Sequence, residues 1–169
     1  MKCFISFLLL FAAITAKAQQ YKIGRDGELI TEKQVSFKEN TAELLPESTE
    51  VLAYIKKYLD DRSYISLLRI EANVTASGES RKDDLLATQR ATAVYTKLIS
   101  MGVDCKRLIA VSFGSNKPVA ETNSPEGKAA NSYIKIFNVA IHGRIIGGME
   151  PNGGGDEIKT SCKRDNGDI

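Results

Sequence analysis

The stretch from Ile65 to Met101 limits the possible folds most tightly, because an alternating segment is followed there by a long amphipathic one. Residues 65–74 alternate between apolar and polar side chains, which predicts a strand with one buried face and one face in water. The polar positions of that strand are Arg69, Glu71 and Asn73. Residues 83–101 then repeat apolar side chains at helical spacing, at Ala87, Ala91, Val94, Leu98 and Met101. Together they predict a helix whose apolar stripe packs against a sheet.

Arg90 lies at the edge of that stripe, roughly 60° from its centre at about 100° per residue. An arginine in this position can rest its aliphatic stem on the core and direct its guanidinium toward the loop 75–82 that precedes the helix. The junction of loop and helix is therefore the first place to expect a binding site. The structural alternative is an arginine that only covers the core, or that pairs with an acid such as Glu71.

The flanking segments complete a recognisable order of elements. Pro46 suits the first turn of a helix, and its buried face is predicted at Val51, Leu52, Ile55, Tyr58 and Leu59. Gly102 is expected to end the longer helix. Strands are predicted at 35–37, 108–113 and 132–141, with a turn-rich loop at 114–127. The order strand, helix, strand, helix, strand, strand predicts an α/β fold (a two-layer α+β sandwich) with two helices on one face of a mixed sheet.

The first 18 residues have the pattern of a secretory signal peptide. Lys2 is followed by an apolar run at 4–13 and by the exit Ala16-Lys17-Ala18. The run is too short to span a membrane as a mature anchor, and no cysteine follows the expected cut, so a lipid anchor is not expected. The alternative is a buried N-terminal helix. The pattern predicts an exported protein whose mature chain begins at Gln19.

The remaining chain divides into three predicted parts. Residues 19–34 form an extended N-terminal segment with a turn at Asp26-Gly27, residues 35–142 form the domain, and residues 143–169 form a flexible glycine-rich tail. Cys105 and Cys162 can pair in an oxidising compartment, but two cysteines make no disulfide framework, and their pairing stays open.

Net charge excludes one class of partner. The formal charge of +2 includes Lys2 and Lys17, so the mature chain is near neutral, and no basic excess points to nucleic acid. No second apolar segment suggests a transmembrane span. The single histidine, His142, is expected on the surface, and no metal site, nucleophile motif or cofactor is predicted.

Six short pieces in a fixed order carry a family resemblance. They are Val35 and Phe37 with Thr41-Ala42 and Leu44; Leu85-Leu86-Ala87-Thr88-Gln89-Arg90-Ala91; Gly102-Val103; Arg107-Leu108; Gly114 to Pro118; and Glu126, Gly127 and Asn131. In these pieces the chain resembles the OmpA-like C-terminal domain, a periplasmic module that ties outer membranes to peptidoglycan. The resemblance covers about Val35 to Ile141. It implies a periplasmic, outer-membrane-associated protein with no catalytic role.

The resemblance also implies a ligand site. In the family an aspartate and the helix arginine grip the free amino-acid end of diaminopimelate in the peptidoglycan stem. Arg90 matches the arginine, but Thr75 stands at the aspartate position, and a hydroxyl cannot balance an ammonium charge. Affinity is expected to fall about tenfold or more. The expected lining is completed by Asn73, Asp83 and Asn131.

Asp83 offers a compensation, since it precedes Arg90 by seven residues, close to two helical turns. It can place a carboxylate at the rim of the pocket; its alternative is a helix N-terminal acid that satisfies the dipole. Two functions follow: non-covalent binding of peptidoglycan, or a degenerate scaffold for protein–protein contacts in an outer-membrane-associated complex. An acid facing Arg90 favours binding, whereas a closed buried ion pair favours the scaffold. A third function, hydrolysis of the wall, is not supported, because it requires paired acids or a metal site and the sequence shows neither.

Overall fold

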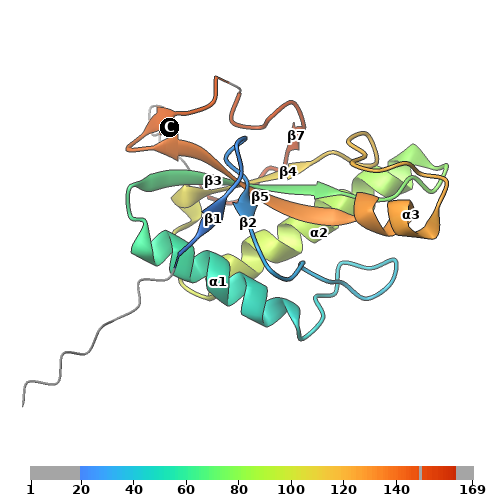
Figure 1. Cartoon of the computed structure of the whole chain (residues 1–169), viewed down its shortest axis with the longest axis horizontal. Helices are drawn as coiled ribbons and strands as arrows, with labels where there is room; N and C mark the ends of the chain where they lie inside the picture. Colours follow the sequence, from blue (N-terminus) through green and yellow to red (C-terminus); the bar gives the residue numbers. More distant parts are fainter. Residues whose placement is uncertain (1–19, 149, 163–169) are drawn as a thin grey trace, which may run out of the picture.

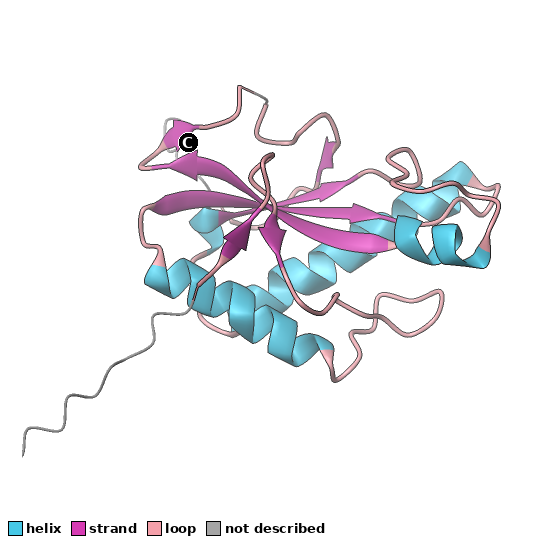
Figure 2. Ribbon diagram, in the orientation of Figure 1, coloured by secondary structure: helices cyan, strands magenta, loops and turns pink. Residues whose placement is uncertain are grey.

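Residues 20–148 and 150–162 are described in the computed structural model, so the predicted leader 1–18 lies outside the described residues. A five-stranded mixed sheet, in the order β6-β5-β3-β4-β7, carries two long helices on one face (Figures 1 and 2). Its strands are β3 (Ile65–Asn73), β4 (Leu108–Ser112), β5 (Tyr133–Ile141), β6 (Arg144–Ile145) and β7 (Asp156–Glu157). The helices are α1 (Ser48–Asp61), α2 (Ser80–Ser100) and the short α3 (Pro125–Asn131). The predicted fold class is confirmed.

The central strand β3 pairs in parallel with β4 and antiparallel with β5. A parallel pair needs a crossover connection, and α2 supplies it between β3 and β4. The short 3₁₀ helix η1 (Cys105–Arg107) leads into β4. This unit of strand, helix and strand is the arrangement predicted from the alternating and helical patterns.

The main core lies between the sheet and the two long helices. From α2, Ala87, Ala91, Val94 and Leu98 are fully buried, as the apolar stripe predicts. They meet the inward face of β3 in one apolar cluster, to which α1 contributes Val51, Leu52, Ile55, Tyr58 and Leu59. Gly102 follows α2 with a φ of +96°, a left-handed conformation that glycine adopts without cost. The predicted helices and core stripe are therefore confirmed.

The N-terminal part differs from the prediction in one respect. Residues 35–37 form no strand; a single bridge joins Phe37 to Leu44. The segment instead folds back on the start of α1, where the Ser48 hydroxyl accepts from Ser36 N at 2.8 Å and donates to Ser36 O at 2.8 Å. The extended segment before it forms a hairpin of β1 (Lys22–Ile23) and β2 (Leu29–Ile30). Its turn contains Gly27 at a φ of +85°, as Asp26-Gly27 predicts.

Helix α3 was not predicted, because its first residues lie in the stretch expected to be a loop. Ser124 accepts a hydrogen bond from Gly127 N at 3.0 Å, and Pro125 occupies the first turn. This serine cap followed by proline is a start signal for a helix, but seven residues are too few to show apolar periodicity.

The face of the sheet opposite α1 and α2, called the outer face below, is covered rather than wet. Arg69, Glu71 and Asn73 were expected in water, yet they are only 4%, 0% and 1% exposed. Alternation shows that a face is polar but not whether another segment covers it. Here Lys117, from the loop after β4, reaches Glu71 at 2.8 Å, and the C-terminal segment crosses above Arg69.

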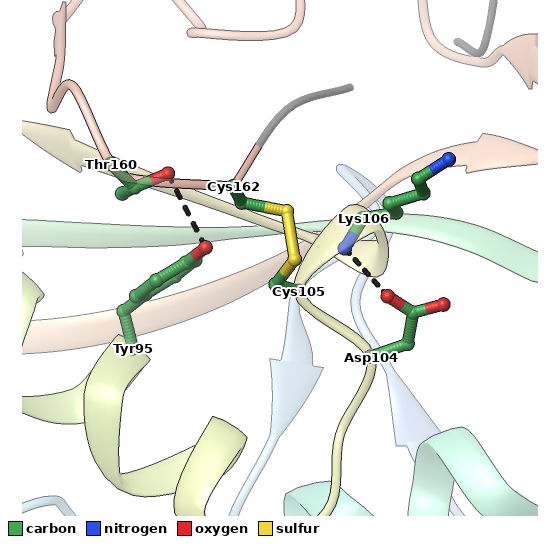
Figure 3. Close-up of a disulfide and its surroundings, with 6 residues drawn as sticks. All are labelled: Tyr95, Asp104, Cys105, Lys106, Thr160 and Cys162. Atoms are coloured by element: carbon green, nitrogen blue, oxygen red, sulfur yellow. Dashed lines mark hydrogen bonds between the residues drawn. A yellow bond between two sulfur atoms is a disulfide. The ribbon is translucent and has the colours of Figure 1, made fainter. Parts of the chain in front are cut away.

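The described part of the predicted flexible tail also has structure. Residues 144–145 and 156–157 add β6 and β7 to the two edges of the sheet. A disulfide joins Cys105 to Cys162, which settles the pairing left open by the sequence (Figure 3). Strands of two residues are too short to show an alternating pattern in the sequence. The disulfide joins cysteines 57 residues apart, so local sequence does not reveal their pairing. The described residues contain no helix with the length and apolar character required to cross a membrane.

Candidate ligand-binding site

Arg90 stands on α2 at the margin of the core and is 9% exposed. Its Nε donates to the carbonyl of Thr41 at 2.9 Å, and its Nη1 donates to the hydroxyl of Ser132 at 2.7 Å. The guanidinium lies over the ring of Phe37, 4.8 Å from the ring centroid. The predicted position at the edge of the buried face is therefore observed. The guanidinium faces these three residues and not the loop 75–82.

The positive charge of Arg90 has no acid partner among the described residues, since none of their carboxylates pairs with its guanidinium. Glu71, the acid considered as its partner, is held instead by Arg69 at 2.7 Å and Lys117 at 2.8 Å. Burial lowers the pKa of Arg90 from its ordinary value, but a guanidinium stays protonated at neutral pH. Such a charge is complementary to a ligand carboxylate.

Asn73 and Thr75, at the end of β3, tie that strand to α3. The Asn73 amide donates to the carbonyl of Asn131 at 2.7 Å, and its oxygen accepts from Lys117 N at 3.0 Å. The Thr75 hydroxyl donates to the carbonyl of Lys128. Asn73 is thus occupied by backbone groups, whereas the Thr75 oxygen keeps its capacity to accept a hydrogen bond.

Asn131 closes the same end of the fold. Its side-chain oxygen accepts from Val119 N at 2.7 Å and Ala120 N at 2.9 Å, and its amide donates to Ala120 O at 2.9 Å. These bonds fix the loop after β4 and place the next residue, Ser132, against Arg90. The structure therefore links Asn73, Thr75, Asn131 and Arg90 through α3, with both asparagines bonded to backbone.

Asp83 lies outside this group. It is 5% exposed, and its two carboxylate oxygens accept from Ser77 N at 3.1 and 3.2 Å. Burial by itself raises the pKa of Asp83, but hydrogen bonds from the backbone and hydroxyl of Ser77 and from the Ser115 hydroxyl outweigh it and lower the pKa below the ordinary value. Asp83 makes no ion pair with Arg90. Among the described residues, neither the facing acid expected for wall binding nor the closed ion pair expected for a scaffold is therefore observed at Arg90. Its contacts order the loop before α2.

A pH titration checks this role of Asp83. Because its folded pKa is lowered, the stability that it contributes is fully present above the unfolded pKa of about 3.9 and is lost as the pH falls through the folded pKa. We expect Asp83→Asn to lower the free energy of unfolding by about 1–3 kcal/mol at pH 7. In urea unfolding, the difference in free energy of unfolding between the wild type and Asp83→Asn should become smaller below about pH 4. An equal difference at pH 3 and pH 7 would contradict this role of Asp83.

The contacts of Arg90 include residues that sequence reasoning did not select for the site. Thr41 and Ser132 are 49 and 42 residues away in the chain. Phe37 and Thr41 belong to the family pattern quoted above, but that pattern does not say which atoms touch the arginine. Among residues 20–148 and 150–162, no three His, Cys, Asp or Glu side chains gather in a way that could hold a metal ion.

Fold and site together define an α/β domain with Arg90 of α2 at the margin of the core, bonded to Thr41 and Ser132. The chain belongs to the OmpA family, which it matches over residues 36–132, more than half of its length.

Individual relatives support the same assignment. A probable lipoprotein of Escherichia coli K12, YiaD, is 28% identical over 102 residues, which are 60% of this chain; the match spans less than half of that protein (46%). The peptidoglycan-associated lipoprotein of Burkholderia pseudomallei superposes with a TM-score of 0.57 at 26% identity, over 62% of this chain and 89% of the other. The periplasmic domain of Helicobacter pylori MotB has the same fold, with a TM-score of 0.59 at 20% identity, over 70% of this chain and 86% of the other.

Proposed function

We propose that this protein is a non-catalytic cell-envelope domain that binds peptidoglycan through a carboxylate of the stem peptide, with diaminopimelate as the residue recognised. The observation that carries the proposal is Arg90, a charged guanidinium at the margin of the core without an acid partner among the described residues. The similarity to a peptidoglycan-associated lipoprotein supports this choice of ligand. In this role the protein is exported and works in the periplasm, beside the outer membrane.

Arg90 is already oriented for such a contact. Nε donates to the Thr41 carbonyl and Nη1 to the Ser132 hydroxyl, and these two bonds hold the guanidinium over the Phe37 ring. The Nη2 amino group makes no hydrogen bond to the described residues and can donate, together with the second hydrogen of Nη1, to two oxygens of a carboxylate. Holding the guanidinium in place beforehand lowers the entropy that binding costs.

The ammonium of the ligand has a weaker partner. Thr75 occupies the position of the family's aspartate, and its oxygen accepts a hydrogen bond without carrying charge. A charge-assisted hydrogen bond contributes roughly 1.5–3 kcal/mol and a neutral one about 1 kcal/mol. The proposed site therefore favours the carboxylate half of the ligand over the ammonium half.

Replacing Thr75 tests whether the ammonium of the ligand is the weakly held half. Thr75→Asp supplies the missing carboxylate, and we expect about tenfold tighter binding of a soluble diaminopimelate-containing stem peptide in calorimetry. Thr75→Val is the matched control, because it keeps the shape but, like Thr75→Asp, loses the hydroxyl bond to the Lys128 carbonyl. It should weaken binding by a few-fold (about 1 kcal/mol). If Thr75→Asp leaves the affinity unchanged, the ammonium does not lie beside Thr75.

The second candidate is a scaffold that has kept the fold and binds envelope proteins in place of the wall. The observation in its favour is that the side-chain amides of Asn73 and Asn131 are already hydrogen-bonded to backbone groups and are therefore not available to a ligand. A scaffold of this kind does not need Arg90 to be charged. Loss of wall binding in Arg90→Ala thus separates the two candidates, because only the first depends on that guanidinium.

A further inference from the structure

The last described segment of the chain crosses the outer face of the sheet and ends in a covalent bond. Residues 150–162 are called the strap below. Its first part, Pro151 to Gly155, lies over the outer face against Arg69 (Figure 1). Its last part lies beside the helix side of the sheet, where Ile158 packs against the main core and Thr160 meets Tyr95 of α2. Within the strap, β7 pairs with the edge strand β4, with Glu157 opposite Val111 and Asp156 opposite Ser112. At its end Cys162 is bonded to Cys105, next to the start of β4 (Figure 3).

Non-covalent contacts of the strap are spread along its length, and Ile158 is the strap residue that packs against the main core. Ile158 N donates to the carbonyl of Ala110 at 2.9 Å, and the Tyr95 hydroxyl donates to that of Thr160 at 3.3 Å. Every described strap residue is exposed or only partly buried. Segments with few buried apolar contacts open locally at a free energy well below that of global unfolding. The disulfide adds a covalent restraint to these partly exposed contacts.

The strap nevertheless closes tightly over a charged cluster. The Arg69 Nη1 donates to the carbonyl of Pro151 at 3.0 Å, while Arg69 itself pairs with the fully buried Glu71. A Cβ placed on Gly153 comes within 2.6 Å of the Arg69 Cζ, and one on Gly155 comes within 2.5 Å of the Val111 Cγ1. The backbone at both positions thus lies close against side chains of the outer face, and a larger residue at either position requires those side chains to shift.

We propose that the strap is a redox-controlled cover: the Cys105–Cys162 disulfide holds it on the outer face, and reduction releases it while the rest of the domain stays folded. A dithiol reductant supplies two electrons and two protons, the disulfide becomes two thiols, and the reductant becomes a disulfide. Release opens the 110–112 edge of β4, whose backbone groups then become available for pairing with another strand. It also exposes the Arg69–Glu71 pair to water.

Hydrogen exchange of the mature chain, oxidised and in dithiothreitol, tests the proposal. We expect amides of the strap and of the β4 edge to exchange about tenfold faster or more after reduction, with β3 and β5 unchanged. Cys162→Ser should reproduce the reduced pattern without a reductant. Equal exchange of the strap in both states overturns the proposal. Faster exchange throughout the domain also overturns the proposal, because the disulfide then stabilises the whole domain and not the strap in particular.

A pair of glycine variants tests the closure itself in the oxidised protein. Gly153 and Gly154 both have positive φ, +62° and +85°, so alanine strains the backbone at either position. Only at Gly153 does the added Cβ meet Arg69; at Gly154 nothing lies within 4 Å. We expect strap amides to exchange about tenfold faster in Gly153→Ala than in Gly154→Ala. Equal rates show that the strap does not close on Arg69 and contradict the proposed cover.

Discussion

Glu71→Gln should lower the free energy of unfolding by about 3–5 kcal/mol, the largest effect on stability that we expect from a single side chain outside the apolar core. Glu71 is fully buried and accepts from Arg69 at 2.7 Å and from Lys117 at 2.8 Å. Glutamine keeps the shape and one acceptor but removes the charge. It leaves the Arg69 guanidinium, which is 4% exposed, without its counter-ion and turns an amide N–H toward either Arg69 or Lys117.

Urea unfolding at pH 7 measures this loss. The matched control is Glu43→Gln, because Glu43 forms an ion pair with Lys38 at 3.6 Å on the surface, with both side chains more than half exposed. Exposed pairs contribute between 0 and about 1 kcal/mol, so this variant should lie close to the wild type. A Glu71→Gln variant as stable as Glu43→Gln would mean that the outer face is not closed as described.

Arg90→Lys should weaken the binding of a soluble stem peptide about ten- to a hundredfold, although the charge is kept. The guanidinium lies over the Phe37 ring, and it donates from Nε to the Thr41 carbonyl and from Nη1 to the Ser132 hydroxyl. A lysine ammonium has no planar fork to satisfy both contacts and still meet a carboxylate with two parallel bonds. If the carboxylate were held by charge alone, Arg90→Lys would leave the affinity nearly unchanged. Recognition through two parallel hydrogen bonds requires the arginine.

Calorimetry measures the affinity, and Arg81→Lys is the control, because Arg81 is an exposed arginine of the same helix. That control should bind within a factor of about two of the wild type. Circular dichroism of Arg90→Lys should match the wild type, since Arg90 lies at the margin of the core. If lysine binds as well as arginine, the carboxylate is held by charge alone.

The long periodic elements could be predicted from the sequence because their signals are local. The alternation of residues 65–74 and the helical stripe of 83–101 fix β3 and α2, and Gly102 marks where α2 ends. Helix α3 and strands β6 and β7 are too short to carry a period. The covering of Arg69 and Glu71 depends on Lys117 and Pro151, which are distant in sequence, so the polar face of β3 could not be recognised as buried.

The same reasoning applies to the candidate site. Helical geometry alone placed Arg90 at the edge of the buried face, where it lies. Its partners Thr41 and Ser132 come from other elements, and their contact depends on the tertiary fold. The seven-residue spacing that brought Asp83 close to Arg90 along the helix did not reveal that Ser77 binds its carboxylate. Spacing gives the position of a side chain, whereas its hydrogen bonds depend on what the fold packs against it.

The most direct test of the proposed function is co-sedimentation of the mature chain, residues 19–169, with insoluble peptidoglycan of the diaminopimelate type, beside Arg90→Ala. We expect the wild-type protein to sediment with the wall and the variant to stay in solution, with both proteins folded. If neither protein sediments, the peptidoglycan-binding role is wrong. If both sediment equally, the wall is bound without Arg90 and the proposed site is wrong.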